Sequence, residues 1–390
     1  DDASNIGNKY SKNTTTMRQG FKFAAVLMAS ALAVVACDKN STDPTSAKEE
    51  TLQKVNETFV DNTVIPTYKN LADKSLDLQA AIEKLQTAPT DANVKAACDL
   101  WKSARQYWEW SEAFLFGAAS KYSIDPHIDT WPLDKVALEN LLDSEKMMSD
   151  IENTVANLNN GLVGFHGIEY ILFRDGKERA ASAIPEKELL YAAAVAKDLS
   201  LSAARLEAAW AGLDNVSYAK KALIEEAEME PEDDFGEQMK LCGQAGSVWK
   251  SVTAGSEQII EGCKDIVDEV GTQKIGKPYT GEDVNYIESP HSWNSIEDFY
   301  DNIVSVRSAY FGALGATTAQ TYSVSAYLAS VDQAANEGVI SAIEKCLEKI
   351  GAMPKPFVKN YKDAKVKEAI DACNDLNDAL EVARQALIND

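Results

Sequence analysis

The stretch that decides the fold is Asp91 to Gly117, which reads DANVKAACDLWKSARQYWEWSEAFLFG. Its large apolar residues recur at helical spacing, which predicts an amphipathic helix with one buried face. That face holds Val94, Cys98, Trp101, Trp108 and Leu115. The same period recurs along most of the chain, and no sustained polar–apolar alternation predicts a strand. The sequence therefore predicts an all-α fold.

Two charged residues interrupt this apolar face. At about 100° per residue, Arg105 lies about 20° from Val94, and Glu112 returns almost to the direction of Val94. Burying an unpaired charge costs on the order of several kcal/mol, so each charge needs a partner or a metal ion. Two interpretations stay open: a buried Arg–Glu arrangement that fixes helix register, or a functional site lined by Glu112.

The rest of the chain divides into ten helical segments. Helices are predicted over residues 48–86, 91–116, 133–158, 162–173, 185–212, 216–229, 238–270, 295–314, 324–350 and 357–388. Two stretches interrupt this series of helices. One is an acidic run at 225–237 that contains Pro231, and the other is a Gly- and Pro-rich stretch at 271–294. We therefore predict two helical-bundle domains, 48–230 and 231–390. Because a loop as long as 271–294 is unusual in a compact domain, we expect it to be functional.

Capping signals support several of these ends. Thr90 precedes the helix at 91–116, and Pro185, followed by Glu186, begins the helix at 185–212. Gly271 is predicted to stop the helix that begins at 238.

The N-terminal region has the layout of a secretory signal. Residues 17–36 combine a short basic region with an apolar run, and the VVAC sequence that ends at Cys37 resembles a bacterial lipobox. Cys37 is the predicted lipidation site, and residues 37–47 would form a polar tether. Residues 1–16 lie upstream of a good start methionine and are predicted not to belong to the fold. The sequence thus predicts a cell-envelope lipoprotein on the periplasmic or cell-surface face.

Charge and cysteine content limit the possible partners. Formal net charge is −23, from 61 acidic and 38 basic residues, without a basic stripe, which argues against a nucleic-acid partner. Acidity also attracts cations weakly at long range. Apart from Cys37, five cysteines remain at spacings that predict neither a disulfide framework nor a thiolate metal site, although a disulfide is compatible with an oxidising compartment. They are Cys98, Cys242, Cys263, Cys346 and Cys373.

A first candidate site segment, DPHIDTWPLD, spans residues 125–134. Its two prolines forbid a continuous helix. Asp134 is accounted for as the cap of the following helix. Asp129 beside Trp131 is a candidate ligand residue, because loops held by rigid helices often bind ligands.

The second candidate segment, GFHGIEY, spans residues 164–170. His166 and Glu169 are three residues apart on a helix, so an imidazole nitrogen and a carboxylate oxygen can reach one ion. Gly164 and Gly167 weaken the helix and are expected to admit a close neighbour. A surface ion pair is the alternative interpretation.

Known catalytic motifs do not fit this segment. A zinc protease of the HExxH type needs a second histidine where Tyr170 stands and a glutamate where Gly167 stands. Neither a GxSxG elbow nor a phosphate-binding or dinucleotide-binding loop occurs. The catalytic residues, if any, are therefore not identified by sequence.

Taken together, these segments resemble the imelysin-like family of bacterial envelope proteins. The resemblance rests on pieces that occur in the family's order over most of the mature chain. They are WKSAR (101–105), EAF (112–114), FG (116–117), IDTWPLD (128–134), the GxHxxE motif at Gly164, His166 and Glu169, SW (292–293), and DF (298–299) through Asn302 to YFG (310–312).

The resemblance implies two helical bundles with the histidine motif in a groove between them. It also implies iron uptake and metal binding by His166 and Glu169; the family is also classified as metallopeptidases. We expect Glu112 and Asp129 to complete the metal site. Arg105, Trp131, Gly164 and Gly167 should lie around the site in the groove.

Three functions are consistent with this. The first is capture of a divalent or trivalent metal ion, with iron favoured over zinc because the ligands are rich in carboxylates. Such a protein would be held at a membrane by its lipid and would pass the metal to a transporter or an outer-membrane receptor. The second is a metal-dependent peptidase. The third is a structural surface lipoprotein with a buried polar network.

Overall fold

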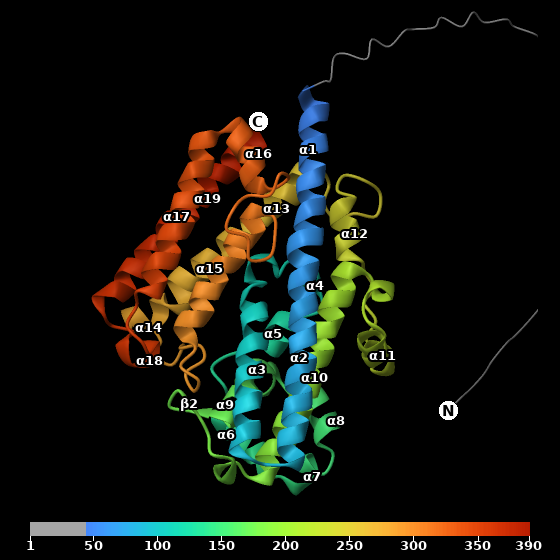
Figure 1. Ribbon diagram of the computed structural model, residues 1–390, viewed down its shortest axis with the longest axis vertical. Coiled ribbons are helices and arrows are strands. Elements are labelled where there is room, and N and C mark those ends of the chain that lie inside the picture. Colours follow the sequence, from blue (N-terminus) through green and yellow to red (C-terminus); the bar gives the residue numbers. More distant parts are fainter. Residues whose placement is uncertain (1–43) are drawn as a thin grey trace, which may run out of the picture. The chain divides into compact units, whose positions relative to one another are not determined.

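The computed structural model describes residues 44–390, so the predicted signal segment and Cys37 lie outside the described residues. Helices dominate this range, and its strands are limited to one antiparallel hairpin, β1 (Phe173–Arg174) with β2 (Lys177–Glu178). The all-α prediction is confirmed (Figure 1). Within residues 44–390, none of the helices combines the length and the apolar character that a membrane crossing requires.

The long helices form the frame of the molecule. They are α1 (Pro44–Phe59), α2 (Ile65–Thr87), α3 (Asp91–Glu109), α10 (Glu186–Ala211), α13 (Val252–Asp268), α15 (Ser295–Phe311), α17 (Gln333–Gly351) and α19 (Ala364–Asn389). The shorter ones are α4 (Ala118–Lys121), α5 (Ile124–Ile128), α6 (Lys135–Leu142), α7 (Glu145–Met148), α8 (Ile151–Ala156), α9 (Gly164–Leu172), α11 (Tyr218–Glu226), α12 (Phe235–Lys240), α14 (Gly276–Thr280), α16 (Val324–Val331) and α18 (Phe357–Asn360).

The first half of the described chain packs around a continuous rod. A π-helical turn, Val60–Val64, joins α1 to α2, and the rod is the blue vertical element in Figure 1. Its α2 part packs against α3 and α10. Trp101 of α3 contacts the rings of Phe165 and Phe173, at centroid distances of 6.3 and 5.3 Å, which fixes α9 and the hairpin against α3.

The second half is a layer of four helices. Within it α17 packs against α19, while α13 packs against α19 and α15. Cys346 of α17 and Cys373 of α19 are buried as thiols with their Sγ atoms 3.5 Å apart. All five cysteines of the described residues are buried, as small apolar core residues are.

The two halves are in direct contact. The rod helix α1 packs against α13, and α3 packs against α15. The described residues form one compact unit. The division into two domains near residue 230 therefore stays a prediction.

Several predicted helix ends were wrong for local reasons. The helix at 91–116 ends at Glu109, because the Ser111 N–H and hydroxyl both donate to the Trp108 carbonyl (2.8 and 2.6 Å) and close the last turn. Glu112 therefore stands on a separate 3₁₀ turn, Glu112–Phe114. The segment 133–158 is three short helices, because Asp134 and Ser144 each cap a new one.

The other differences lie around α13. The segment 238–270 contains two helices, α12 and α13, with a non-helical connection. Gly271 does not stop α13; a π-helical turn, Glu269–Lys274, continues it, and the predicted loop at 271–294 also contains α14. The caps predicted at Thr90 and Pro185 are confirmed.

One half-buried ion pair makes fold stability depend on pH. His127 Nε2 of α5 lies 2.7 Å from Asp198 Oδ2 of α10, and this hydrogen bond outweighs burial and raises the pKa of His127 above its ordinary 6.5. A raised histidine pKa stabilises the fold fully below the unfolded-state value, and the contribution is lost as pH rises through the folded-state pKa. Asp198→Asn should therefore lower the free energy of unfolding by about 1–2 kcal/mol at pH 5.5 and by clearly less at pH 8.5.

Urea unfolding at the two pH values measures this difference. The control is Asp214→Asn, which removes an exposed partner of Lys221 (2.6 Å). Its small effect should stay constant, because lysine keeps its proton across this range. An equal loss for Asp198→Asn at both pH values would contradict the assignment.

Candidate metal centre

A cluster of buried ionisable side chains joins the two halves of the molecule. It draws on α3, the 3₁₀ turn Glu112–Phe114, the end of α5, α9, the π-helical turn Glu269–Lys274, and α15 with the segment that leads into it. Its most exposed member, Glu112, is only 7% exposed, so water screens these charges poorly. The members are Arg105, Glu109, Glu112, Asp129, His166, Glu169, Lys274, Glu288 and Asp298.

Arg105 is the central cation of this cluster. Its guanidinium is fully buried and pairs with Glu109 (2.5 Å), Glu288 (2.6 Å) and Asp129, while Asp298 lies 3.7 Å from its Nε. Burial lowers the pKa of Arg105, but these four carboxylates outweigh burial and raise it well above the usual value. Arg105 therefore stays charged. The sequence-based expectation that it has buried partners is met by carboxylates from both halves.

His166 is held between two carboxylates. Its Nδ1 lies 3.1 Å from Glu169 Oε2, and its Nε2 lies 3.1 Å from Asp129 Oδ1. The direction of the second approach is poor, so Nε2 is a buried nitrogen without a properly formed hydrogen bond. Burial lowers the pKa of His166, but the contacts with Asp129 and Glu169 outweigh it and raise the pKa to about 9.

Glu169 has both carboxylate oxygens engaged. Oε1 accepts the backbone N–H groups of His291 (2.9 Å) and Ser292 (2.7 Å) and the Ser292 hydroxyl (2.8 Å), while Oε2 faces His166. Burial raises the pKa of Glu169, but His166 and the backbone donors outweigh burial and lower it. Glu169 therefore orients the imidazole and anchors the segment that follows Glu288.

Asp129 is the carboxylate nearest to the free imidazole nitrogen. Its Oδ2 accepts the indole N–H of Trp108 at 2.6 Å, and its Oδ1 lies between Arg105 and His166. Burial raises the pKa of Asp129, but the charges of Arg105 and His166 outweigh it and hold the pKa below the ordinary aspartate value. Asp129 therefore places an ionised carboxylate beside His166 Nε2.

Lys274 supplies the second fixed cation. Its ammonium lies 3.2 Å from Glu288, 3.7 Å from Glu109 and 3.8 Å from Glu112. It comes from the π-helical turn, a backbone irregularity that is common at functional sites. Burial raises the pKa of Glu112 well above normal despite the attraction of Lys274.

Negative charge is in excess in the cluster. Its six carboxylates face two permanent cations, Arg105 and Lys274, and one titratable imidazole. Three negative charges would stay uncompensated even with His166 protonated. Burial accordingly raises the pKa of Glu109 well above normal and that of Asp298 to about 7. The cluster must take up protons or a cation to be neutral.

Three groups in the cluster bring ligand atoms within 4.8 Å of one another. They are Asp129–His166–Glu288, Glu109–Glu112–Asp129 and Glu109–Glu288–Asp298. The first combines an imidazole nitrogen with two carboxylates, a donor set that suits iron or zinc. Since its His166 Nε2 lacks a good hydrogen bond, this group fits a metal ion best of the three.

Sequence reasoning found part of this set. His166 and Asp129 lie together as predicted, but the third residue of their group is Glu288, while Glu112 belongs to a neighbouring group and Glu169 to none of the three. The sequence did not point to Lys274, Glu288 or Asp298 individually, because each is remote in sequence from His166. Glu109 was detectable, since it follows Arg105 by one helical turn.

The remaining predicted residues surround this group. Trp131 packs 6.0 Å from the His166 ring and 5.2 Å from Tyr286. A Cβ on Gly164 would lie 2.1 Å from the Ile128 carbonyl oxygen, and one on Gly167 would lie 2.5 Å from the Tyr191 hydroxyl. Both glycines thus allow the close approach of neighbouring elements that their positions predicted.

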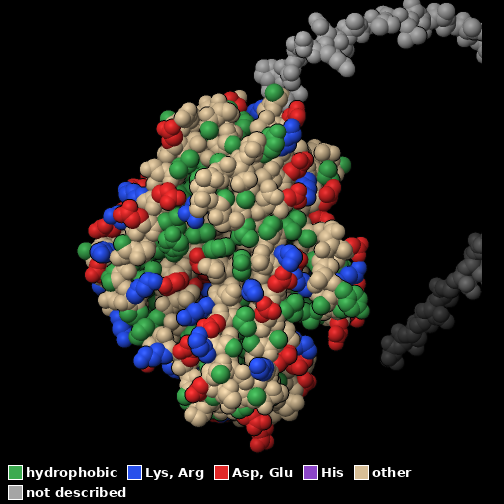
Figure 2. Space-filling view, in the orientation of Figure 1, with side chains coloured by type: hydrophobic (Ala, Val, Ile, Leu, Met, Phe, Trp, Pro, Cys, Tyr) green, Lys and Arg blue, Asp and Glu red, His purple; other side chains and the backbone are tan. Residues whose placement is uncertain are grey.

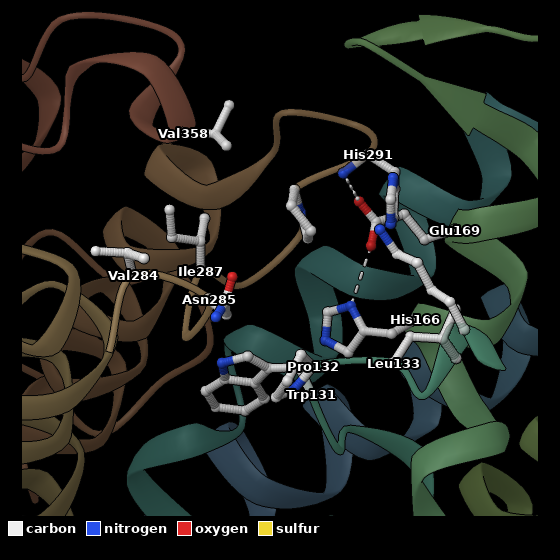
Figure 3. Close-up of a pocket in the computed structure, with 12 residues that line it drawn as sticks. Trp131, Pro132, Leu133, His166, Glu169, Val284, Asn285, Ile287, His291 and Val358 are labelled. Carbon is white, nitrogen blue, oxygen red and sulfur yellow. Dashed lines mark hydrogen bonds and ion pairs between the residues drawn. The ribbon is translucent and has the colours of Figure 1, made fainter. Parts of the chain in front are cut away.

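A cavity of about 340 Å³ opens in front of His166. Figure 3 shows His166 and Glu169 on one side of it and Asn285 with Ile287 on the other, and Trp131 lies below them in this view. The apolar side chains of Pro132, Leu133 and Val358 also line it. Of the buried cluster, His166 and Glu169 line this cavity.

Comparison with known proteins identifies relatives of this chain. The family model described as Imelysin matches residues 64–383. Iron-regulated protein A of Synechococcus elongatus is 28% identical over 254 residues, which cover 65% of this chain and 63% of that protein, less than two thirds of its length.

Two solved structures are also similar. The crystal structure of an iron-regulated protein A precursor from Parabacteroides distasonis superposes with a TM-score of 0.77 at 29% identity, covering 87% of this chain and 95% of that one. An imelysin-like protein from Psychrobacter arcticum shares the fold, with a TM-score of 0.59 at 16% identity over 85% of this chain and 93% of that one.

The position of His166 depends on Gly164, which yields a stability prediction. Gly164 has a φ of +73°, and its missing side chain leaves room for Ile128. Gly164→Ala should lower the free energy of unfolding by about 3 kcal/mol or more, because it adds both a backbone clash and an unfavourable φ. Denaturant unfolding measures this loss. The matched control is Gly338→Ala, in an open position on α17, which should leave stability unchanged or raise it by up to about 1 kcal/mol. Equal effects of the two substitutions would contradict the packing argument.

Proposed function

Because this chain belongs to the imelysin family, as its sequence predicted, we propose that it binds a metal ion, iron in the first instance, beside His166 and takes part in iron uptake at the cell envelope. One observation carries the proposal: a buried imidazole nitrogen without a good hydrogen bond faces carboxylates that are in excess over the cations around them. The relatives named iron-regulated protein A agree with an iron-related role.

His166, Asp129 and Glu288 would hold the ion. Glu169 would not be a ligand; its hydrogen bond to Nδ1 would direct Nε2 toward the metal, as carboxylates beside metal-bound histidines do. Glu112 and Glu109 would place further negative charge close to Asp129. Bound metal supplies positive charge that the cluster lacks, and carboxylate-rich ligation favours iron over a structural zinc.

Peptide hydrolysis is the second candidate, which the family's classification favours. A hydrolytic metal needs a free general base beside its water. Glu169 cannot serve as this base, because both of its oxygens are engaged. Metal capture therefore accounts for the arrangement better, because it does not require a free general base beside the metal.

Envelope attachment belongs to the same proposal. The predicted signal at residues 17–36 and lipidation of Cys37 would tether the protein to a membrane, on the periplasmic or cell-surface face. A metal transporter or an outer-membrane receptor would then take over the ion.

Metal binding by the purified protein tests the proposal. In anaerobic calorimetric titrations with Fe²⁺ and in titrations with Zn²⁺, we expect one ion per chain. His166→Ala should weaken binding at least 100-fold, and Glu169→Gln should weaken it about 10- to 100-fold by releasing the imidazole. His127→Ala is the control, since His127 is a half-buried histidine that bonds to Asp198 and is not a member of the cluster, and it should bind normally.

The alternatives predict different results. A purely structural network would give equally weak binding in all four proteins, and His166→Ala would lower the thermal midpoint with or without metal. A peptidase would cleave unfolded protein substrates only in the presence of metal, and His166→Ala would stop the cleavage.

A further inference from the structure

The cavity in front of His166 is bordered by cations that lack acidic partners. The chain carries 61 acidic and only 38 basic residues, so most lysine and arginine side chains could find a carboxylate partner. Nevertheless, the salt bridges within residues 44–390 include none from four cations around this cavity. They are Lys135, Arg174, Lys277 and Lys359.

Two of these cations stand on the α9 side of the cavity. Lys135 lines the cavity, and its ammonium lies 5.8 Å from the centre of the Tyr170 ring. Arg174 stacks on the same ring at 3.8 Å. The Tyr170 ring in turn packs 5.1 Å from His291, which lines the cavity. Lys135 therefore borders the cavity, and Arg174 is linked to it through the rings of Tyr170 and His291.

The other two cations lie close to other parts of the cavity lining. The Lys277 ammonium lies 4.0 Å from the centre of the Tyr286 ring, and Tyr286 packs against Trp131, a lining residue. Lys359 lies over the Trp293 ring at 4.3 Å and follows Val358, which also lines the cavity. Figure 2 shows several Lys and Arg side chains in the lower left of the molecule, where α14 and α18 are labelled in Figure 1.

The cavity itself has the size and lining of an organic ligand site. Its volume of about 340 Å³ is far larger than a single ion needs and lies at the lower end of the range for small-molecule pockets. Its walls combine Trp131, Leu133 and Ile287 with the amide of Asn285, and Glu169, whose oxygens are already hydrogen-bonded, is the carboxylate among the lining residues. Apolar walls with a few polar groups and a positive rim favour a small organic anion.

We propose that this cavity binds a small organic polycarboxylate, with the Lys135 side in contact with its carboxylates and His166 at its inner end. The inference rests on the proposed function in one respect: the anion would meet the metal from the cavity side, whereas Asp129 and Glu288 meet it from the interior. The natural ligand is then either the free polycarboxylate or its complex with iron.

Titration of the purified protein with citrate and with ferric citrate tests this inference. We expect saturable 1:1 binding of at least one of them. A charge contact at a partly exposed rim contributes up to about 1 kcal/mol, so Lys135→Gln should weaken binding about 5-fold, and Lys135→Gln with Lys277→Gln about 10- to 30-fold. Val358→Trp, which fills the cavity, should abolish binding.

Lys250→Gln is the matched control. Lys250 is exposed and also has no salt-bridge partner within residues 44–390. It lies just before the N-terminus of α13, whereas the π-helical turn with Lys274 follows the C-terminus of this helix. It should bind citrate like the parent protein. Fe²⁺ binding by the Lys135 and Val358 variants should stay close to normal, because neither residue is a metal ligand.

The outcomes separate this inference from the metal proposal. Binding of citrate alone identifies the free anion as ligand, and binding of ferric citrate only identifies the complex; both support the inference. No binding of either compound, or binding that Lys135→Gln and Val358→Trp leave unchanged, overturns it whatever Fe²⁺ does. Citrate binding without Fe²⁺ binding would retain the anion cavity and overturn the metal proposal.

Discussion

The structure depends on the neutralisation of Arg105. A guanidinium stays protonated even where it is fully buried, so the surrounding chain has to bring negative charge to it. Glu109 comes from the same helix, Asp129 from the end of α5, and Glu288 and Asp298 from the second half of the molecule. The contact between the two halves is therefore organised around one cation.

The same cluster contains more carboxylates than the neutralisation of Arg105 and Lys274 requires. A network that only fixed the packing would be most stable with balanced charge, since an uncompensated buried carboxylate opposes folding. Here Glu109, Glu112 and Asp298 have raised pKa values, because burial outweighs the attraction of Arg105 and Lys274. Such an imbalance is expected where a charged ligand completes the site, which is the reasoning behind the proposed function.

Sequence alone predicted those parts of the site that are local along the chain. Arg105 could be recognised as buried because helical spacing places it among tryptophans, and His166 with Glu169 because they are one turn apart. Glu288 and Lys274 were not predicted, because their contacts with Arg105, Glu109 and Glu112 span more than 100 residues. The role of Glu112 was altered by a local event, the closing of α3 by Ser111, which periodicity does not report.

The distance in sequence between Arg105 and Glu288, 183 residues, has a consequence for the order of events in synthesis. A chain that emerges with its N-terminus first exposes Arg105, Asp129 and His166 long before Glu288 exists. An incomplete chain can pack its first helices, but it lacks Lys274 and two of the four carboxylates of Arg105. The cluster around Arg105 can therefore form only after Asp298 has been made, and a product truncated before Lys274 would carry the histidine motif without its partners from the second half.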